Sequence, residues 1–338
     1  MRRLLMLVAT VVLASCGGGG GGTGAPPAPS GNTLTAPSNF RITLQKVNLT
    51  SNEISLSWSG SGSTYHVFGA STSGGGDKLS VDVTGQSYTW VAPREEAVYF
   101  VRVVATSGGN ASPPSIELPV FTMDLRNAID ALFFGSGPMA DQPEQSRFNP
   151  PASIWPDGTV VRIMVSAEAG DANRVLAQVF ADDYAATVGG AVRATTEIVS
   201  DDFHNTPLSG LPAFSIGMRV LRVCTGTLVV ACANFGPAPL GTNRAFVNLN
   251  GVGGGISVSH EMGHTYGLFH VHVNASARPE LNFLMNPVLL TDRLSDPEKN
   301  AIIAARNGGI HAGTTRNEAL AAGLVLPVTG QPSIFNRR

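Results

Sequence analysis

The sequence predicts a multidomain chain in which an all-β sandwich is followed by an α+β domain. Short runs within residues 36–121 alternate apolar and polar side chains, which is typical of strands with one buried face. From residue 122 onward, segments with helical spacing of apolar residues are mixed with buried-strand patterns. The length of 338 residues suits two domains of ordinary size.

Residues 1–15 have the pattern of an export signal. Met1-Arg2-Arg3 is basic, and the apolar stretch Leu4–Leu13 is too short for an ordinary membrane-spanning helix. The stretch ends in Leu13-Ala14-Ser15-Cys16, which resembles the lipobox of bacterial lipoproteins. The resemblance implies lipidation of Cys16 and, because Gly17 follows, anchoring in the outer membrane, facing the periplasm or the cell surface. The alternative is an ordinary signal peptide with an incidental cysteine.

Residues 16–35 form a predicted tether between this anchor and the folded body. The segment is rich first in glycine and then in proline, and it has almost no apolar side chains with which to build a core. We therefore expect a flexible linker.

The charge of the chain excludes one class of partner. Charged residues make up 14% of the sequence, the formal net charge is −2, and there is no long basic run. Binding to nucleic acid needs clustered lysine and arginine to neutralise phosphates. We therefore expect no nucleic acid partner.

Three runs in residues 36–121 carry the strand prediction. Ile54–Trp58 is apolar at every second position, Tyr65–Phe68 begins another short strand, and Tyr99–Ala105 alternates again. Turn-forming clusters separate them, as at Ser71–Gly76 and Ser107–Asn110. Several short strands with turns between them predict a sandwich.

The same segment resembles a fibronectin type III domain. It opens with Ala36-Pro37-Ser38-Asn39-Phe40, has Trp58 at the place of the family's core tryptophan, and has Tyr99 in a Tyr-x-Val-x-Val strand. Ser112-Pro113-Pro114-Ser115 fits the final hairpin. An unrelated small β-sandwich is the alternative. Because the segment has no recognisable group of catalytic or metal-binding residues, it is either a spacer or a module that binds a surface ligand.

The elements predicted for residues 122–338 are a mixture of helices and strands. Helical spacing is found at 125–134 and 173–188, and strand patterning at 160–165, 192–199, 218–223 and 244–249. Ser295-Asp296-Pro297-Glu298 is a strong helix start, with serine as N-cap and proline just inside. We expect that helix to run to about Arg306.

Cys224 and Cys232 remain after Cys16 is assigned to the lipobox. An exported chain folds under oxidising conditions, so we expect a disulfide between these two cysteines. Two free thiols or soft metal ligands are the alternatives.

The segment that carries chemistry is His260–His270, which reads H-E-x-x-H-x-x-G-x-x-H. On a helix, His260 and His264 lie on one face and can share one Zn²⁺. Gly267 tolerates the positive φ that turns the chain sharply, so that His270 becomes the third ligand.

Three neutral ligands leave one tetrahedral position to water, which is typical of catalytic zinc. The metal lowers the pKa of its water, and Glu261 is placed to act as general base and then general acid. A zinc site without catalysis is the alternative.

The motif resembles the metzincin clan of zinc endopeptidases. This implies a methionine turn beneath the metal, and Asn282–Pro287 fits, with Met285 as an apolar floor and not a ligand. An ordinary core methionine is the alternative. Some metzincins have a tyrosine two residues after that methionine, whereas this chain has Pro287, so the resemblance implies no tyrosine contact. It is secure over residues 260–287 and weaker over the rest of 122–338.

Other candidates have less support. His272 is either a contact to substrate or to a ligand, or an ordinary loop residue, while His204 and His311 are expected in solvent. The strand 244–249 precedes the active-site helix, and we hypothesise that an extended substrate pairs with it.

The sequence thus predicts a zinc-dependent endopeptidase that is exported and anchored at Cys16. Its partners would be protein or peptide substrates. The competing hypothesis is a surface-anchored binding or adhesion lipoprotein whose zinc site is structural or idle.

Overall fold

The computed structural model describes residues 34–95, 97–140, 151–224, 231–233, 243–251, 255–272, 283–286 and 291–327. The predicted signal (1–15), Cys16, nearly all of the tether and Pro287 lie outside the described residues. Among the helices that are described, none combines the length and the apolar character needed to cross a membrane.

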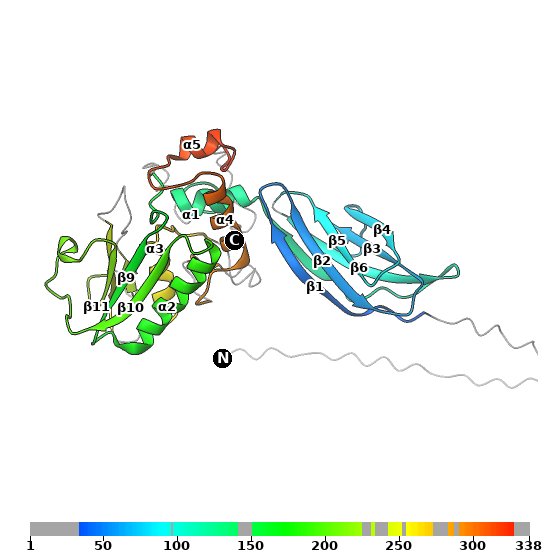
Figure 1. Cartoon of the computed structure of the whole chain (residues 1–338). Coiled ribbons are helices and arrows are strands. Elements are labelled where there is room, and N and C mark those ends of the chain that lie inside the picture. Colours follow the sequence, from blue (N-terminus) through cyan, green and yellow to red (C-terminus); the bar gives the residue numbers. More distant parts are fainter. Residues whose placement is uncertain are drawn as a thin grey trace, which may run out of the picture. The chain divides into compact units, whose positions relative to one another are not determined.

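The first half of the described chain forms two antiparallel sheets (Figure 1). One sheet has the order β1-β2-β5 and consists of β1 (Ser38–Val47), β2 (Asn52–Ser59) and β5 (Ser87–Ala92). The other has the order β4-β3-β6-β7, with β8 also paired to β6, and consists of β3 (Thr64–Ala70), β4 (Leu79–Val83), β6 (Ala97–Ser107), β7 (Asn110–Ala111) and β8 (Leu118–Thr122). This confirms the predicted sandwich.

Alternation along the strands builds the core between these sheets. In β2 every second residue is buried, including Trp58, and β6 buries Tyr99 in the same way. Trp58 meets Tyr65 edge-on with ring centroids 5.6 Å apart, and Trp90 meets Tyr99 at 5.3 Å. The aromatic residues that the sequence places in the core are therefore the ones that join the two sheets.

The second half contains a five-stranded mixed sheet with the order β10-β9-β11-β13-β12. Its strands are β9 (Val160–Ser166), β10 (Arg193–Val199), β11 (Ser215–Val220), β12 (Ala231–Ala233) and β13 (Arg244–Leu249). Only β12 runs antiparallel to its neighbour; the other described pairings in this sheet are parallel.

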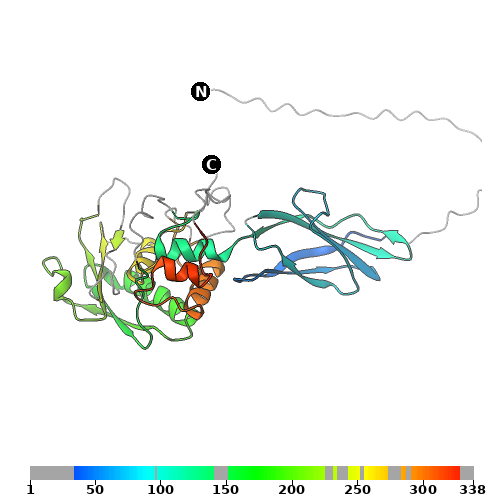
Figure 2. The same ribbon diagram turned by 90° about the horizontal axis from the view of Figure 1, so that it is seen from above.

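The second half also contains the described helices, of which α2 and α3 lie beside the sheet (Figures 1 and 2). They are α1 (Leu125–Phe134), α2 (Gly170–Thr187), α3 (Ser257–Thr265), α4 (Asp296–Asn307), α5 (Arg316–Ala321) and the short 3₁₀ helix η2 (Leu208–Gly210). α2 contacts β9, β10 and α3, and α3 contacts the edge formed by β12 and β13. The helix α3 is thus held between α2 and one edge of the sheet.

Local sequence signals account for the helix ends. The side chain of Asp124 accepts a hydrogen bond from the amide of Arg126 and caps α1, which ends at Gly135 in the left-handed conformation. The predicted start of α4 is confirmed, because Ser295 and Glu298 form a complete capping box.

The hypothesis that substrate pairs with strand 244–249 is wrong for Val247–Leu249, which pair with β12. On its other side β13 is paired with β11 along its whole length. β12 is the last strand of the sheet on this side, and it is not predicted from the sequence. The reason is that a three-residue strand has too few positions for alternation to be visible.

Candidate metal centre

Helix α3 and the turn after it place three histidines close together. His260 and His264 are four residues apart on α3, so both project from one face. The helix ends at Thr265, and the amide of Leu268 then donates to the carbonyl of Gly263 at 3.0 Å. This turn reverses the chain, so His270 approaches the same point from outside the helix.

Gly267 makes the reversal possible. Its φ is +86°, which L-residues with a side chain rarely adopt. A Cβ added at this position would lie 1.4 Å from the carbonyl oxygen of Ser153, which is backbone and cannot swing aside. Glycine is therefore required at residue 267 by both conformation and space.

Backbone hydrogen bonds fix the loop that carries His270. The amide of Phe269 donates to the carbonyl of Leu132 at the end of α1 at 2.8 Å, and the amide of Val271 donates to Met285 at 2.9 Å. The amide of His272 donates to Met139 at 2.8 Å. Hydrogen bonds to Leu132 and Met139, which belong to the described part of residues 122–158, thus support this loop.

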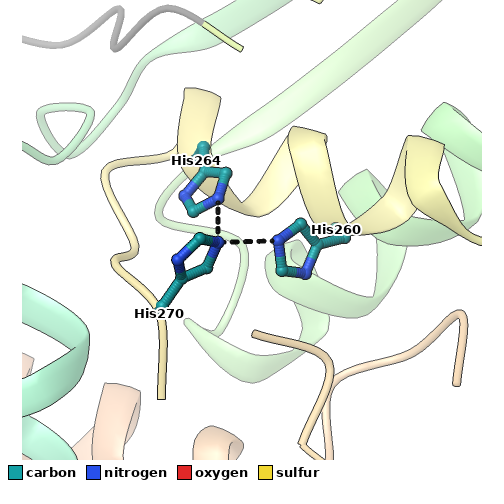
Figure 3. Close-up of side chains that lie close together, drawn as sticks. All are labelled: His260, His264 and His270. Atoms are coloured by element: carbon teal, nitrogen blue, oxygen red, sulfur yellow. Dashed lines mark hydrogen bonds between the residues drawn. The ribbon is translucent and has the colours of Figure 1, made fainter. Parts of the chain in front are cut away.

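The ring nitrogens of the three histidines converge on one point (Figure 3). Nε2 of His270 lies 3.1 Å from Nε2 of His260 and 3.0 Å from Nε2 of His264. Tetrahedral coordination with bonds of about 2.05 Å puts ligand nitrogens about 3.3 Å apart. Within the described residues, these histidines are the one group of three His, Cys, Asp or Glu side chains close enough to share an ion.

The hydrogen bonds of the other ring nitrogens determine the tautomers. Nδ1 of His260 donates to the carbonyl of Leu284 at 2.8 Å, and Nδ1 of His264 donates to Leu268 at 2.7 Å. Each Nε2 therefore presents a lone pair to the centre, as metal-ligating imidazoles do. Burial lowers the pKa of His260 to about 4 and the pKa of His264 well below its usual value, so both rings are neutral.

Hydrogen bonding among the three histidines cannot satisfy these lone pairs. A ring nitrogen carries at most one hydrogen, so Nε2 of His270 can donate to His260 or to His264 but not to both. A cation at the centre would accept all three lone pairs at once. The donor set therefore fits a transition metal ion that favours imidazole ligands.

Glu261 lies on α3 next to the first histidine and is buried, with 8% of its surface exposed. Its carboxylate accepts a hydrogen bond from the backbone amide of Ala233 on the edge strand β12. Burial raises the pKa of Glu261 to about 7, and the Ala233 hydrogen bond opposes that shift. A bound cation would lower the pKa of Glu261 again.

Met285 lies directly against α3. The residue is fully buried, and a Cβ added at Gly263 would lie 2.3 Å from its sulfur. The absence of a side chain at Gly263 thus lets the thioether pack on the helix one residue before His264. The role of Met285 as an apolar floor beneath a metal stays a prediction.

The predicted disulfide between Cys224 and Cys232 is present in the structure. Cys232 lies on β12, next to Ala233, so the disulfide ties the edge strand to the end of the segment that follows β11. The bond therefore restrains the strand whose amide contacts Glu261.

Replacing both cysteines by serine should lower the unfolding free energy of the protein by about 2.5 kcal/mol, because closing a loop this short costs an entropy of that size. Thermal unfolding of the double variant and of wild type, each with and without reductant, measures the effect. Reductant should lower the unfolding temperature of wild type only. Equal unfolding temperatures for the two proteins without reductant would contradict the stabilising role.

The remaining candidate histidines lie apart from the centre. His204 is paired with Glu168, the nitrogen and oxygen being 3.3 Å apart, and it also faces Asp202. Nδ1 of His311 contacts the carbonyl of Gly309 at 2.6 Å. Neither residue belongs to the group of three histidines.

Two contributors to the centre were not predicted from the sequence. The amide of Ala233 reaches Glu261, and the carbonyl of Leu284 orients His260. Both act through backbone groups, which every residue has, so no residue type could have marked them.

The solved structures similar to this chain include fibronectin type III domains. The fibronectin type III domain of human fibronectin type III domain containing protein 3 is 27% identical, with 28% of this chain and 93% of that chain covered and a TM-score of 0.23. The FN5 domain of Drosophila Lar is 18% identical, with 27% of this chain and 98% of that chain covered and a TM-score of 0.23. Domains A168-A170 of titin are 20% identical, with 27% of this chain covered and a TM-score of 0.23. The match covers 32% of the titin chain, so this chain spans about a third of it. The chain matches no family model and no curated protein.

Proposed function

We propose that the chain is a zinc-dependent endopeptidase whose metal is held by His260, His264 and His270. The observation that carries the proposal is the convergence of three imidazole Nε2 atoms, with the buried carboxylate of Glu261 next to His260 in the chain. Sites with three protein ligands and an open fourth position are typical of catalytic zinc, whereas structural zinc sites have four.

Zinc is favoured among imidazole-binding metals because the reaction needs a Lewis acid and no redox change. When bound, the ion polarises the peptide carbonyl and makes a water molecule acidic near neutral pH. The protein must then supply orientation of the ligands, exclusion of bulk water and a carrier for the proton. The hydrogen bonds at Nδ1 orient His260 and His264, and the burial of His260 and Glu261 limits the access of bulk water.

Glu261 is the proposed proton carrier. Its carboxylate takes the proton of the attacking water as the bond to the peptide carbon forms. It then delivers that proton to the nitrogen of the leaving amine as the peptide bond breaks. The Ala233 amide holds the carboxylate while it changes protonation state.

An extended peptide is the substrate that the surroundings of Glu261 fit best. β12 is the edge strand of the sheet and lies next to Glu261, so a peptide could add to it as a further strand. The proposal also includes export and anchoring through lipidated Cys16, which rest on the sequence of residues 1–16.

The decisive experiment compares wild type with Glu261→Gln on denatured protein substrates. We expect kcat/KM to fall by about 10²–10⁴-fold, because general acid–base catalysis contributes that much. Zinc content, measured by elemental analysis, should stay at one ion per chain in both proteins. Glu197→Gln changes a surface glutamate that pairs with Arg162 and should leave turnover unchanged.

The competing function is a surface-anchored binding protein with an idle zinc site. It is favoured if wild type and Glu261→Gln both bind zinc and show the same negligible cleavage. That result would rule out the peptidase proposal.

A further inference from the structure

Glu298 on α4 is a fully buried carboxylate that contacts the turn beneath the histidines. One oxygen, Oε1, accepts a hydrogen bond from the amide of Met285 at 2.8 Å. The other, Oε2, accepts from the amide of Leu284 at 2.9 Å and from the amide and hydroxyl of Ser295 at 2.7 and 2.8 Å. A single side chain thus joins the start of α4 to the methionine turn.

The two turn residues held by Glu298 contact both parts of the ligand set. The carbonyl of Leu284 accepts the Nδ1 hydrogen of His260. The carbonyl of Met285 accepts from the amide of Val271, which is next to His270. The side chain of Met285 also packs against α3 at Gly263. Displacement of this turn would therefore disturb His260 and His270 together.

We infer that Glu298 is a positioning residue for the metal centre, acting through the peptide groups of Leu284 and Met285. The inference rests on the proposed zinc-binding role of the three histidines, and it adds a residue that touches neither metal nor substrate. Partners that orient metal-ligating histidines commonly change metal affinity by about 10–100-fold when they are removed.

The chemistry of the contacts requires a carboxylate at residue 298. All the partners named above are donors, and an ionised carboxylate is an acceptor at both oxygens. Glutamine has the same shape, but its NH₂ group would face either the Met285 amide or the donors at the other oxygen. Glu298→Gln therefore removes part of the anchoring without leaving a cavity.

Glu318 provides a matched control. It occupies the same capping-box position at the start of α5, where it accepts from the amide and hydroxyl of Thr315 at 2.7 and 2.9 Å. It is exposed, and its described hydrogen bonds remain within its own helix start. Glu318→Gln weakens a capping box without touching the methionine turn.

The test is zinc affinity of the full-length protein, measured by competition with a chromophoric zinc chelator. We expect Glu298→Gln to bind zinc about tenfold or more weakly than wild type. Glu318→Gln should stay within about twofold of wild type. Because the readout is zinc binding and not cleavage, it is informative even if the peptidase proposal fails.

A loss of stability alone must be separated from the positioning role. Ile302→Val opens a small cavity in the buried face of α4 and lowers stability without changing the turn. The unfolding temperatures of the metal-free proteins show how much stability Glu298→Gln and Ile302→Val each lose. Wild-type zinc affinity in Glu298→Gln, or an equal loss of affinity in Ile302→Val, would overturn the inference.

Should Glu298→Gln fail to fold, Glu298→Asp serves in its place. Aspartate keeps the charge and can cap α4, but it is one methylene shorter and cannot reach both Ser295 and the turn. We expect the same loss of zinc affinity, and unchanged affinity would again overturn the inference.

Discussion

Replacing His264 by alanine should abolish zinc binding and peptide hydrolysis together. His264 supplies one of three converging Nε2 lone pairs, so its loss leaves two protein ligands for the ion. We expect a larger loss of affinity than the 10–100-fold that follows removal of a residue behind a ligand. Chelator competition measures the zinc affinity, and cleavage of a denatured protein substrate measures the activity.

His311→Ala is the matched control, because His311 lies outside the group of three and is exposed. It should retain both zinc and activity. If His264→Ala kept full hydrolysis, the three-histidine site could not be the reaction centre, whatever metal it held.

Gly267→Ala should destabilise the second domain by about 4 kcal/mol or more. Alanine at positive φ costs about 1–2 kcal/mol, and its Cβ would meet the carbonyl oxygen of Ser153 at 1.4 Å. Relief of that clash requires either the turn or the Ser153 segment to move, and the turn carries His270. We expect lower unfolding temperature and weaker zinc binding in the same variant.

Gly309→Ala separates the cost of alanine at positive φ from the cost of the steric clash with Ser153. Gly309 has a comparable φ of +94°, but a Cβ there meets nothing within 4 Å. Gly309→Ala should therefore lower the unfolding free energy only by the cost of alanine at positive φ, about 1–2 kcal/mol, and leave zinc binding intact. Equal unfolding temperatures for the two alanine variants would show that the contact with Ser153 is relieved without cost.

Sequence patterns were sufficient where a structure is set by local periodicity. The alternation around Trp58 and Tyr99 predicted buried strands of the sandwich, and both residues are in its core. The capping residues Ser295 and Glu298 predicted the start of α4. The spacing from His260 to His270 predicted three histidines around one point, and the structure brings their nitrogens together.

The rest of the centre depends on contacts between distant segments. Glu298 was recognised from sequence only as a helix cap, because its bonds to Leu284 and Met285 depend on where an irregular turn lies. The edge strand β12 was missed because it is three residues long. β12 pairs with β13 and takes the place at the edge of the sheet. The apolar alternation within a strand does not tell which other strand pairs with it.

All three histidines come from one stretch of eleven residues, yet part of what orients them comes later in the chain. The Leu284 carbonyl and the Met285 turn follow by more than a dozen residues, and Glu298, which holds that turn, follows by more than a dozen again. A growing polypeptide released only as far as His270 therefore has every ligand and lacks the floor that aligns them. Alignment of the three histidines by this turn thus has to wait until Glu298 has been synthesised.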